Sequence, residues 1–307
     1  MMKKAFQKTT ALLLALLMLV SCSVMAFCEE TVQAGDAYYE QGDYTLHYTV
    51  VPAEGAYKGR ILFLHGFLYS GSTWDGAAQI MSQNGYDCYL VDLPNYGQST
   101  RENQDITPID REELVVGMMQ TIAPLDEWLL AGHSMGGGVA LNIACDHPEL
   151  KGLMLFCPSE IQMPGETILN PLTQSAFFQK CFTGMFNAIV RSTPIVKLAL
   201  FMVTKNWSYA SSYDTAILTE PLLRDGTATG IFYSMAYARN TDLDAIAGIS
   251  VPTLLVWADS DIVISQANTQ NITDALPDAE VHTVSGSHLV IETDPEEIAG
   301  LMLDFLK

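Results

Sequence analysis

The pentapeptide GHSMG at residues 132–136 lies between an apolar run, Trp128 to Ala131, and a helix-length segment that begins at Met135. A serine in this strand–turn–helix context is typical of a sharp, strained turn that pushes its hydroxyl out above a sheet. Glycines two positions to either side permit the close backbone approach that such a turn needs. The motif therefore predicts a strand, a tight turn and a helix in direct succession, with Ser134 as a candidate nucleophile.

The chain around this motif alternates short apolar runs with helix-length segments. Two β-rich runs on either side of Gly42 and Asp43 predict a hairpin over Tyr38 to Pro52. Alternating strands and helices form a mainly parallel sheet that is covered on both faces. We therefore expect an α/β fold with a mainly parallel eight-stranded sheet and the hairpin at one edge. The other six strands are predicted at Arg60–His65, Tyr86–Leu93, Trp128–His133, Leu153–Cys157, Thr253–Trp257 and Ala279–Val284, and helices at Thr73–Gln83, Pro108–Ile122, Met135–Asp146 and Gln266–Leu276.

A long segment, residues 159–250, separates the sixth and seventh strands and is far longer than a crossover needs. We expect a helical lid inserted after strand 6 of a core formed by residues 36–158 and 251–307. The large apolar residues of the lid suit the buried faces of its helices; the alternative is an exposed apolar surface for a greasy substrate or a membrane. These residues are Phe177, Phe178, Phe182, Met185, Phe186, Phe201, Met202, Phe232, Tyr233, Met235 and Tyr237.

A serine nucleophile needs an imidazole to take its proton and a carboxylate to orient that imidazole. Asp261 follows the strand Thr253–Trp257, and His288 follows the strand Ala279–Val284. The chain order serine, aspartate, histidine is the order of one known arrangement of these groups. Ser134, Asp261 and His288 are therefore the candidate catalytic residues.

An oxyanion formed at such a site needs two hydrogen-bond donors. The backbone amide of Met135 is one candidate, because it begins the helix after the serine. The amide of Phe67 is the other, because it follows the strand that ends at His65 and Gly66.

Several motifs resemble those of the α/β-hydrolase superfamily, and the resemblance covers nearly the whole chain after the N-terminal leader. His65–Phe67 is similar to the oxyanion motif HGF, Asp92–Ser99 resembles the DLPGxGxS loop, and Gly132–Gly137 matches GHSMGG. With the insertion after strand 6, GHSMGG resembles the subgroup of monoacylglycerol-lipase-like and serine-aminopeptidase-like hydrolases. Two residues depart from the pattern: Asn95 replaces the usual glycine, and Ala258 replaces the glycine of the acid motif GxxD.

The acid of the site has two alternatives to Asp261. Asp259 lies two residues earlier, and Glu160 follows the preceding strand. Counting from Ala258 as the motif position favours Asp261.

The resemblance implies a serine hydrolase that cleaves a carboxylic ester, such as a carboxylesterase or a monoacylglycerol-lipase-like enzyme, through an acyl-enzyme on Ser134. An amidase or peptidase, a thioesterase or a cofactor-free haloperoxidase could use the same residues, and a non-catalytic ligand-binding protein of the same fold is a further alternative. An aminopeptidase needs acids in the lid, where Glu166, Asp214, Glu220 and Asp225 occur. No cofactor and no metal site is expected, since neither HExxH nor CxxC occurs.

Residues 1–28 are typical of a bacterial signal peptide, with Lys3, Lys4 and Lys8 before the apolar run Ala11–Val20. The segment Leu19–Cys22 resembles a lipobox, which favours lipidation of Cys22 and a membrane tether; cleavage after Ala26 is the alternative. Export is therefore expected, to the medium or to the outer face of the cell membrane.

The formal net charge is −20. A surface this acidic repels nucleic acid and anionic headgroups, so a small-molecule acyl ester is the expected partner and nucleic acid is not. From Cys28 onwards the chain has five cysteines at irregular spacings, and this odd number without a CxxC pair indicates neither a disulfide framework nor a zinc site.

Overall fold

The computed structural model describes residues 32–103, 105–106, 109–159, 175–237, 239, 242–264 and 266–307. The chain divides into two compact units, residues 1–33 and 34–307. The second unit is described below. The predicted signal peptide with Cys22, and the acids Glu160 and Glu166, lie outside the described residues.

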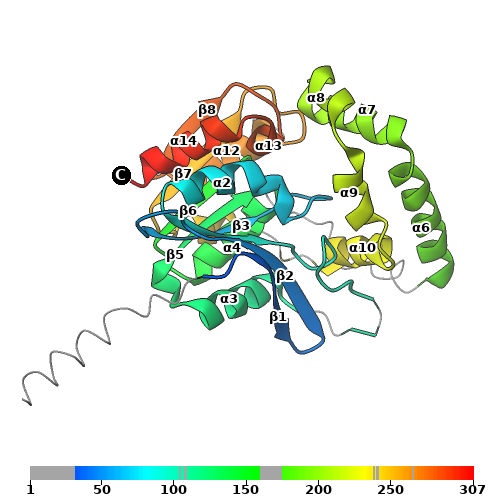
Figure 1. Ribbon diagram of the computed structural model, residues 1–307, viewed down its shortest axis with the longest axis horizontal. Coiled ribbons are helices and arrows are strands. Elements are labelled where there is room, and N and C mark those ends of the chain that lie inside the picture. Colours follow the sequence, from blue (N-terminus) through cyan, green and yellow to red (C-terminus); the bar gives the residue numbers. More distant parts are fainter. Residues whose placement is uncertain are drawn as a thin grey trace, which may run out of the picture. The chain divides into compact units, whose positions relative to one another are not determined.

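The second unit is built on one sheet of eight strands in the order β1-β2-β4-β3-β5-β6-β7-β8 (Figure 1). The six strands β3 to β8 are parallel, while β1 and β2 pair as an antiparallel hairpin at one edge. The predicted fold class and the edge position of the hairpin are confirmed. The strands are β1 (Gly35–Gln41), β2 (Tyr44–Val51), β3 (Gly59–Leu64), β4 (Tyr86–Val91), β5 (Trp128–His133), β6 (Gly152–Phe156), β7 (Thr253–Ala258) and β8 (Glu280–Val284).

The central strands are mostly apolar because helices cover both faces of the sheet. Every residue of β4, β5, β6 and β7 is buried, whereas exposed and half-buried residues share the edge strand β1. In the parallel register Leu64 lies beside Gly132 and Phe156 beside Val256. The loops that leave these strands therefore emerge together at the carboxyl edge of the sheet.

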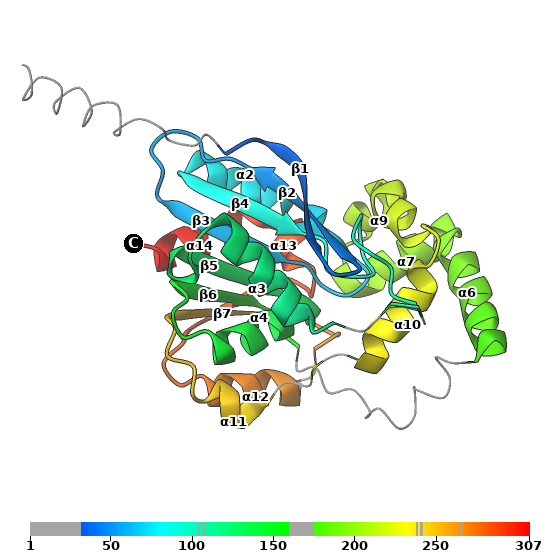
Figure 2. The same ribbon diagram turned by 90° about the horizontal axis from the view of Figure 1, so that it is seen from below.

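Two groups of helices form the outer layers (Figure 2). On one face, Trp74 packs against Phe63 and Phe156, with ring centroids 5.1 and 5.4 Å apart, at the centre of the main hydrophobic core. This face carries η1 (Gly71–Trp74), α2 (Asp75–Gln83), α13 (Val290–Thr293) and α14 (Pro295–Phe305); the other carries α3 (Arg111–Ile122), α4 (Met135–Asp146), α11 (Leu243–Ile246) and α12 (Gln266–Ala275).

The described part of the segment between β6 and β7 is largely helical, as expected. Five of its helices lie together on one side of the sheet in both views (Figures 1 and 2). Its predicted limits at 159 and 250 stay a prediction, because residues 160–174 lie outside the described residues. The five helices, called the insertion helices below, are α6 (Ala176–Val190), α7 (Thr193–Thr204), α8 (Trp207–Ser212), α9 (Thr215–Leu222) and α10 (Thr227–Tyr237).

Two arginines fasten the insertion helices to the core. Arg101 donates to the carbonyl of Gly97 in the core, at 2.7 Å, and to Pro221 and Thr227 in the insertion, at 3.1 and 2.9 Å. Arg224 of the insertion donates to the same Gly97 carbonyl at 2.6 Å. Charged donors on backbone carbonyls give strong, directional hydrogen bonds, so this junction holds the insertion at a fixed place on the loop after β4.

Candidate active site

Ser134 lies on a strained turn between β5 and α4. Its φ of 51° and ψ of −120° lie outside the regions that L-residues usually occupy. Added Cβ atoms at Gly132 and Gly136 would lie 2.5 Å from the carbonyl oxygens of Gly136 and Leu64, respectively. Both glycines of the motif are therefore needed for backbone to pass backbone at the turn, which is why the sequence GxSxG folds in this way.

The turn brings Ser134 to the two other residues that the sequence singled out. The Oγ atom of Ser134 lies 2.9 Å from Nε2 of His288, and Nδ1 of His288 lies 2.7 Å from Oδ2 of Asp261. His288 is 5% exposed and Ser134 7%. A neutral imidazole that donates from Nδ1 to a carboxylate has Nε2 free to accept the serine proton, so this arrangement can activate the hydroxyl.

The carboxylate of Asp261 is held ionised at this place. Burial would raise its pKa, but the hydrogen bond and charge of His288 and the amides of Val263 and Ile264 lower it overall. These amides lie 2.7 and 3.0 Å from Oδ1 of Asp261. Asp259, the alternative acid, is exposed and accepts the amide of Gly286 at 3.1 Å. The structure thus places Asp261 against His288 and Asp259 at the surface.

His133, the residue before Ser134, supports His288 directly. Its Nε2 donates to the carbonyl of His288 at 2.7 Å, and the two rings pack with centroids 4.8 Å apart. Burial and the neighbouring His288 lower the pKa of His133 to about 3, so its ring is neutral at ordinary pH. These residues are far apart in the sequence, and no pattern in it signals the contact.

The loop after β3 passes against the serine. An added Cβ at Gly66 would lie 3.2 Å from Cβ of Ser134 and 2.8 Å from Nδ1 of His133. His65 fixes the loop, since its Nδ1 donates to the Gly66 carbonyl at 2.7 Å and its Nε2 accepts the Leu93 amide at 3.0 Å. The loop thus brings the chain at Phe67, a predicted oxyanion donor, to the side of the serine.

The second predicted donor, Met135, is the first residue of α4. Amides in the first turn of a helix have no acceptor within the helix, and the helix dipole adds positive potential there. Phe67 and Ser134 line one pocket, and Met135 follows Ser134 directly. Phe67 and Met135 as oxyanion donors stay a prediction.

The residue that departs from the loop motif, Asn95, has a φ of 79°. Asparagine tolerates this left-handed conformation better than most residues, so it can stand where glycine is usual. Its amide nitrogen also donates to Glu102 at 2.5 Å. The departure therefore keeps the shape of the loop.

A pocket of about 270 Å³ opens onto Ser134 and His288. Within the described part of the chain, its lining contains no Asp, Glu, Lys or Arg. The insertion supplies most of the wall, from α6, α7 and α9. The lining residues of these three helices are Ile189, Val190, Ile195, Val196, Ala199, Leu200, Val203, Leu218, Thr219 and Leu222.

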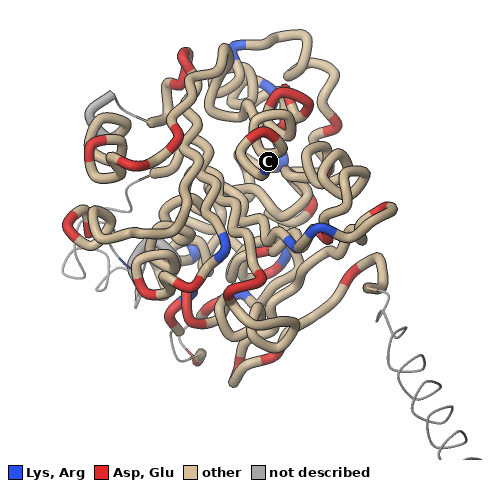
Figure 3. Tube along the Cα trace, turned by 90° about the vertical axis from the view of Figure 1, so that its left-hand side faces the viewer, with Lys and Arg blue, Asp and Glu red and all other residues tan. Residues whose placement is uncertain are grey.

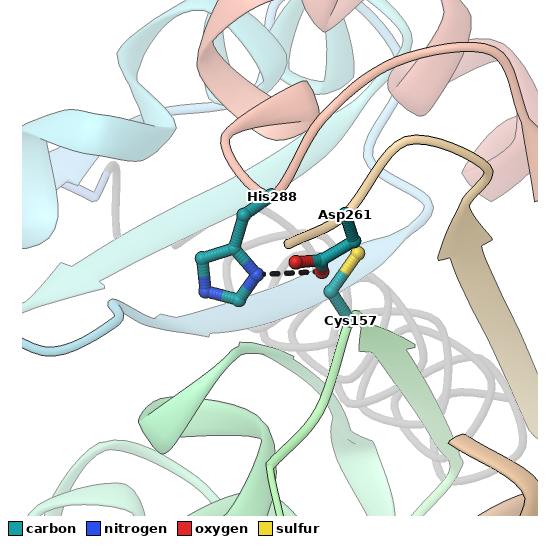
Figure 4. A group of neighbouring side chains, drawn as sticks. All are labelled: Cys157, Asp261 and His288. Atoms are coloured by element: carbon teal, nitrogen blue, oxygen red, sulfur yellow. Dashed lines mark hydrogen bonds and ion pairs between the residues drawn. The ribbon is translucent and has the colours of Figure 1, made fainter. Parts of the chain in front are cut away.

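A buried cysteine, Cys157, lies beside the acid of this site (Figure 4). The thiol of Cys157 and the ligand atoms of Asp261 and His288 lie within 4.8 Å of one another, the one such group found among the described residues. Burial and the charge of Asp261 raise the pKa of the Cys157 thiol far above its usual range. A thiol that keeps its proton is a poor metal ligand, and His288 and Asp261 are already paired. The prediction that the site needs no metal and no cofactor stays a prediction.

The fold and this site define a hydrolase. The family model described as "alpha/beta hydrolase fold" matches residues 59–295, and the chain belongs to this family. Over 289 residues it is 25% identical to the uncharacterized hydrolase YugF of Bacillus subtilis (strain 168), covering 90% of this chain and 96% of that protein. Over 280 residues it is 24% identical to monoacylglycerol lipase abhd6-B of Xenopus laevis, covering 88% and 81%.

A solved structure with the same fold is the enol-lactonase from Burkholderia xenovorans LB400. Its TM-score is 0.70 at 16% identity, and the match covers 88% of this chain and 99% of that one. The predicted resemblance to the α/β-hydrolase superfamily, with monoacylglycerol-lipase-like relatives, is confirmed.

Proposed function

We propose that the protein is a serine esterase that cleaves carboxylic esters with apolar acyl chains through an acyl-enzyme on Ser134. One observation carries the proposal. The hydrogen-bonded series from Asp261 through His288 to Ser134 ends in a pocket whose wall is apolar. Such a wall suits a hydrocarbon chain next to the reacting carbonyl.

In this mechanism Ser134 Oγ attacks the ester carbonyl while His288 Nε2 takes the hydroxyl proton. The amides of Phe67 and Met135 hold the oxyanion, and His288 returns the proton to the departing alcohol. Water then attacks the acyl-enzyme with His288 again as base, which releases the acid and restores Ser134. Asp261 stays ionised throughout and holds the imidazole in place.

The pocket favours an ester over a peptide. An aminopeptidase needs a carboxylate near the substrate amino group, yet Asp214, Glu220 and Asp225, the described acids of the insertion considered for this role, do not line the pocket. The relative named monoacylglycerol lipase abhd6-B also supports an ester substrate.

Covalent labelling tests the nucleophile. A fluorophosphonate probe is expected to label the wild type and the control Ser212→Ala, an exposed serine of α8, but not Ser134→Ala. Labelling of Ser134→Ala at the wild-type rate would show that another residue reacts.

The chain-length preference is tested with p-nitrophenyl esters. We expect kcat/KM to rise at least about tenfold from acetate to octanoate, because each buried CH₂ contributes about 0.8 kcal/mol. A flat series, or faster turnover of aminoacyl-anilides than of any ester, would contradict an apolar acyl substrate.

We also propose that the protein is exported and carries a lipid on Cys22. The basic start and the apolar run Ala11–Val20 support this. Mass spectrometry of the N-terminus after expression in a bacterial host is expected to find a diacylated Cys22. A mature chain that begins at Phe27 would indicate simple cleavage instead.

A further inference from the structure

The insertion helices carry an unusual share of the exposed apolar surface. Of the fifteen large apolar side chains that are exposed in the described part of the chain, eight lie on α6, α7 and α8. Exposed apolar side chains gathered in one region mark an interaction surface. The eight, called the insertion face below, are Phe177, Met185, Ile189, Ile195, Leu198, Phe201, Met202 and Trp207.

The insertion face follows helical periodicity. Ile195, Leu198 and Met202 are spaced by three and four residues and form one stripe on α7, while Val196 and Leu200 on the opposite side are buried. Such a stripe on an amphipathic helix usually faces a core. Here the helix already buries its other side, so this stripe faces outwards.

The same helices contain no acidic residue. The chain has 35 acidic residues, but residues 175–213 contain none, while they contain Lys180, Arg191, Lys197 and Lys205. Lys180, Arg191 and Lys205 are exposed, and no ion pair within the described residues engages them. Acidic residues predominate over the side of the molecule drawn in Figure 3. The negative charge is therefore unevenly distributed, and α6 to α8 form a cationic, apolar region.

This region borders the pocket that contains Ser134. Ile189 and Ile195 are both exposed and both line the pocket, so apolar surface continues from the outside to its interior. Within the described part of the chain, no single helix is long and apolar enough to cross a membrane; α6 and α7 together pass this test but bend by 81° at their break.

We propose that α6, α7 and α8 dock the protein on a bilayer that contains anionic lipid. The insertion face enters the boundary between headgroups and acyl chains, and Lys180, Arg191 and Lys205 lie among the lipid phosphates. The acidic remainder of the protein is repelled by the same charge, which sets one orientation. In that orientation the mouth of the pocket borders the lipid.

The fluorescence of Trp207 can report this docking directly. It is 57% exposed on α8, whereas Trp74 and Trp128 are fully buried and Trp257 is 6% exposed. With the full chain carrying Cys22→Ser, which removes the proposed lipid, and vesicles of phosphatidylcholine and phosphatidylglycerol (3:1), we expect a blue shift of tryptophan emission and quenching by brominated acyl chains. Trp207→Phe should abolish both signals. Vesicles of phosphatidylcholine alone should bind at least ten times more weakly, and 0.5 M salt should reduce binding to the mixed vesicles.

Two sets of variants separate the apolar from the charged contribution. Leu198→Glu with Met202→Glu, and Lys180→Gln with Arg191→Gln and Lys205→Gln, should each weaken vesicle binding at least tenfold. The matched controls Val281→Glu on β8 and Lys151→Gln with Lys307→Gln should bind as the wild type does. Leu198 and Met202 are exposed and do not line the pocket, so their substitution should leave the fold and the pocket intact. An unchanged thermal unfolding temperature would show that the variants are folded.

Three results would overturn the proposal. Equal binding to neutral and anionic vesicles would remove the role of the cations. Vesicle binding without quenching of Trp207 would show that the N-terminal segment alone attaches the protein. A dimer in solution that Leu198→Glu with Met202→Glu abolishes would make the insertion face a contact between two copies of the chain. None of these measurements depends on turnover, so they stand apart from the test of Ser134.

Discussion

The sheet core and the insertion helices place polar and apolar side chains in opposite ways. In the core, the side chains of His133 and His288 are buried and hydrogen-bonded, and the central strands are fully buried. In the insertion, α6 has a single buried residue, Val190, and exposes several large apolar side chains. A catalytic site must hold its atoms to a fraction of an ångström, which suits the rigid sheet core. Contact with varied apolar partners suits the insertion helices.

The largest expected effect separates two aspartates at the end of β7. Asp261→Asn should lower kcat by about 10³–10⁴-fold, because His288 loses the partner that fixes its tautomer. Asp259→Asn should remain within about threefold of the wild type, since Asp259 is exposed and accepts a single backbone amide. Ester hydrolysis by the two variants checks this. A near-normal rate for Asp261→Asn would assign the acid elsewhere.

A substitution in the insertion should change the substrate preference and leave the chemistry intact. Ala199 on α7 lines the pocket, so Ala199→Trp should fill it and lower kcat/KM for the octanoate ester by about 10–100-fold. The acetate ester should lose less than about threefold, because Ser134 and His288 are untouched. Ala188→Trp, on the exposed side of α6 and away from the pocket, is the matched control. Equal losses for both esters would mean that the insertion also shapes the reacting groups.

The smallest expected effect is on stability in the core. Burial, and then Asp110, raise the pKa of Glu112 from 4.5 to about 7. The folded state therefore keeps this proton to a higher pH than the unfolded chain does, and stability falls as the pH rises from 4.5 to 7. Glutamine matches the protonated acid, since it can accept from Asn142 and donate to Asp110.

Glu112→Gln should thus raise the free energy of unfolding by about 1–2 kcal/mol at pH 8, and the gain should vanish below pH 4.5. Urea denaturation across this range measures it. Glu113→Gln, an exposed neighbour in the same turn, should show no such pH dependence. A gain that is equal at pH 4 and pH 8 would contradict the role of burial.

Much of the core could be predicted from the sequence because its signals are local. Buried parallel strands read as unbroken apolar runs, and the predicted strand Trp128–His133 coincides with β5. The turn at Ser134 could be predicted because the motif has glycines where two backbone segments come into close contact and leave no room for a Cβ atom. Asp261 and His288 follow strands of the same sheet, and parallel strands bring their carboxyl ends together.

The remaining features depend on contacts between distant residues. The ring of His133 contacts His288 only after the sheet has formed, and buried Glu112 accepts a hydrogen bond from Asn142 of another helix. The insertion helices do not alternate with strands of the sheet, so no regular pattern in the sequence predicts where each helix begins and ends. One feature of the insertion could have been found in the sequence. Residues 175–213 contain no acidic residue, but the net charge of −20, which is summed over the whole chain, does not reveal this local difference.

The pairing of β6 with β7 has a consequence for folding. Leu153 lies beside Thr253, so two adjacent strands of the sheet meet only after the chain between them has closed a very long loop. The entropy of closing a flexible loop grows only with the logarithm of its length, by about 0.6 kcal/mol for each doubling. The free energy of folding therefore depends little on the length of the segment between β6 and β7. The folding rate depends on it more strongly, because contacts between distant residues form slowly. A different segment could be exchanged at this junction with little change in the thermodynamics of the sheet, and refolding speed would record the exchange.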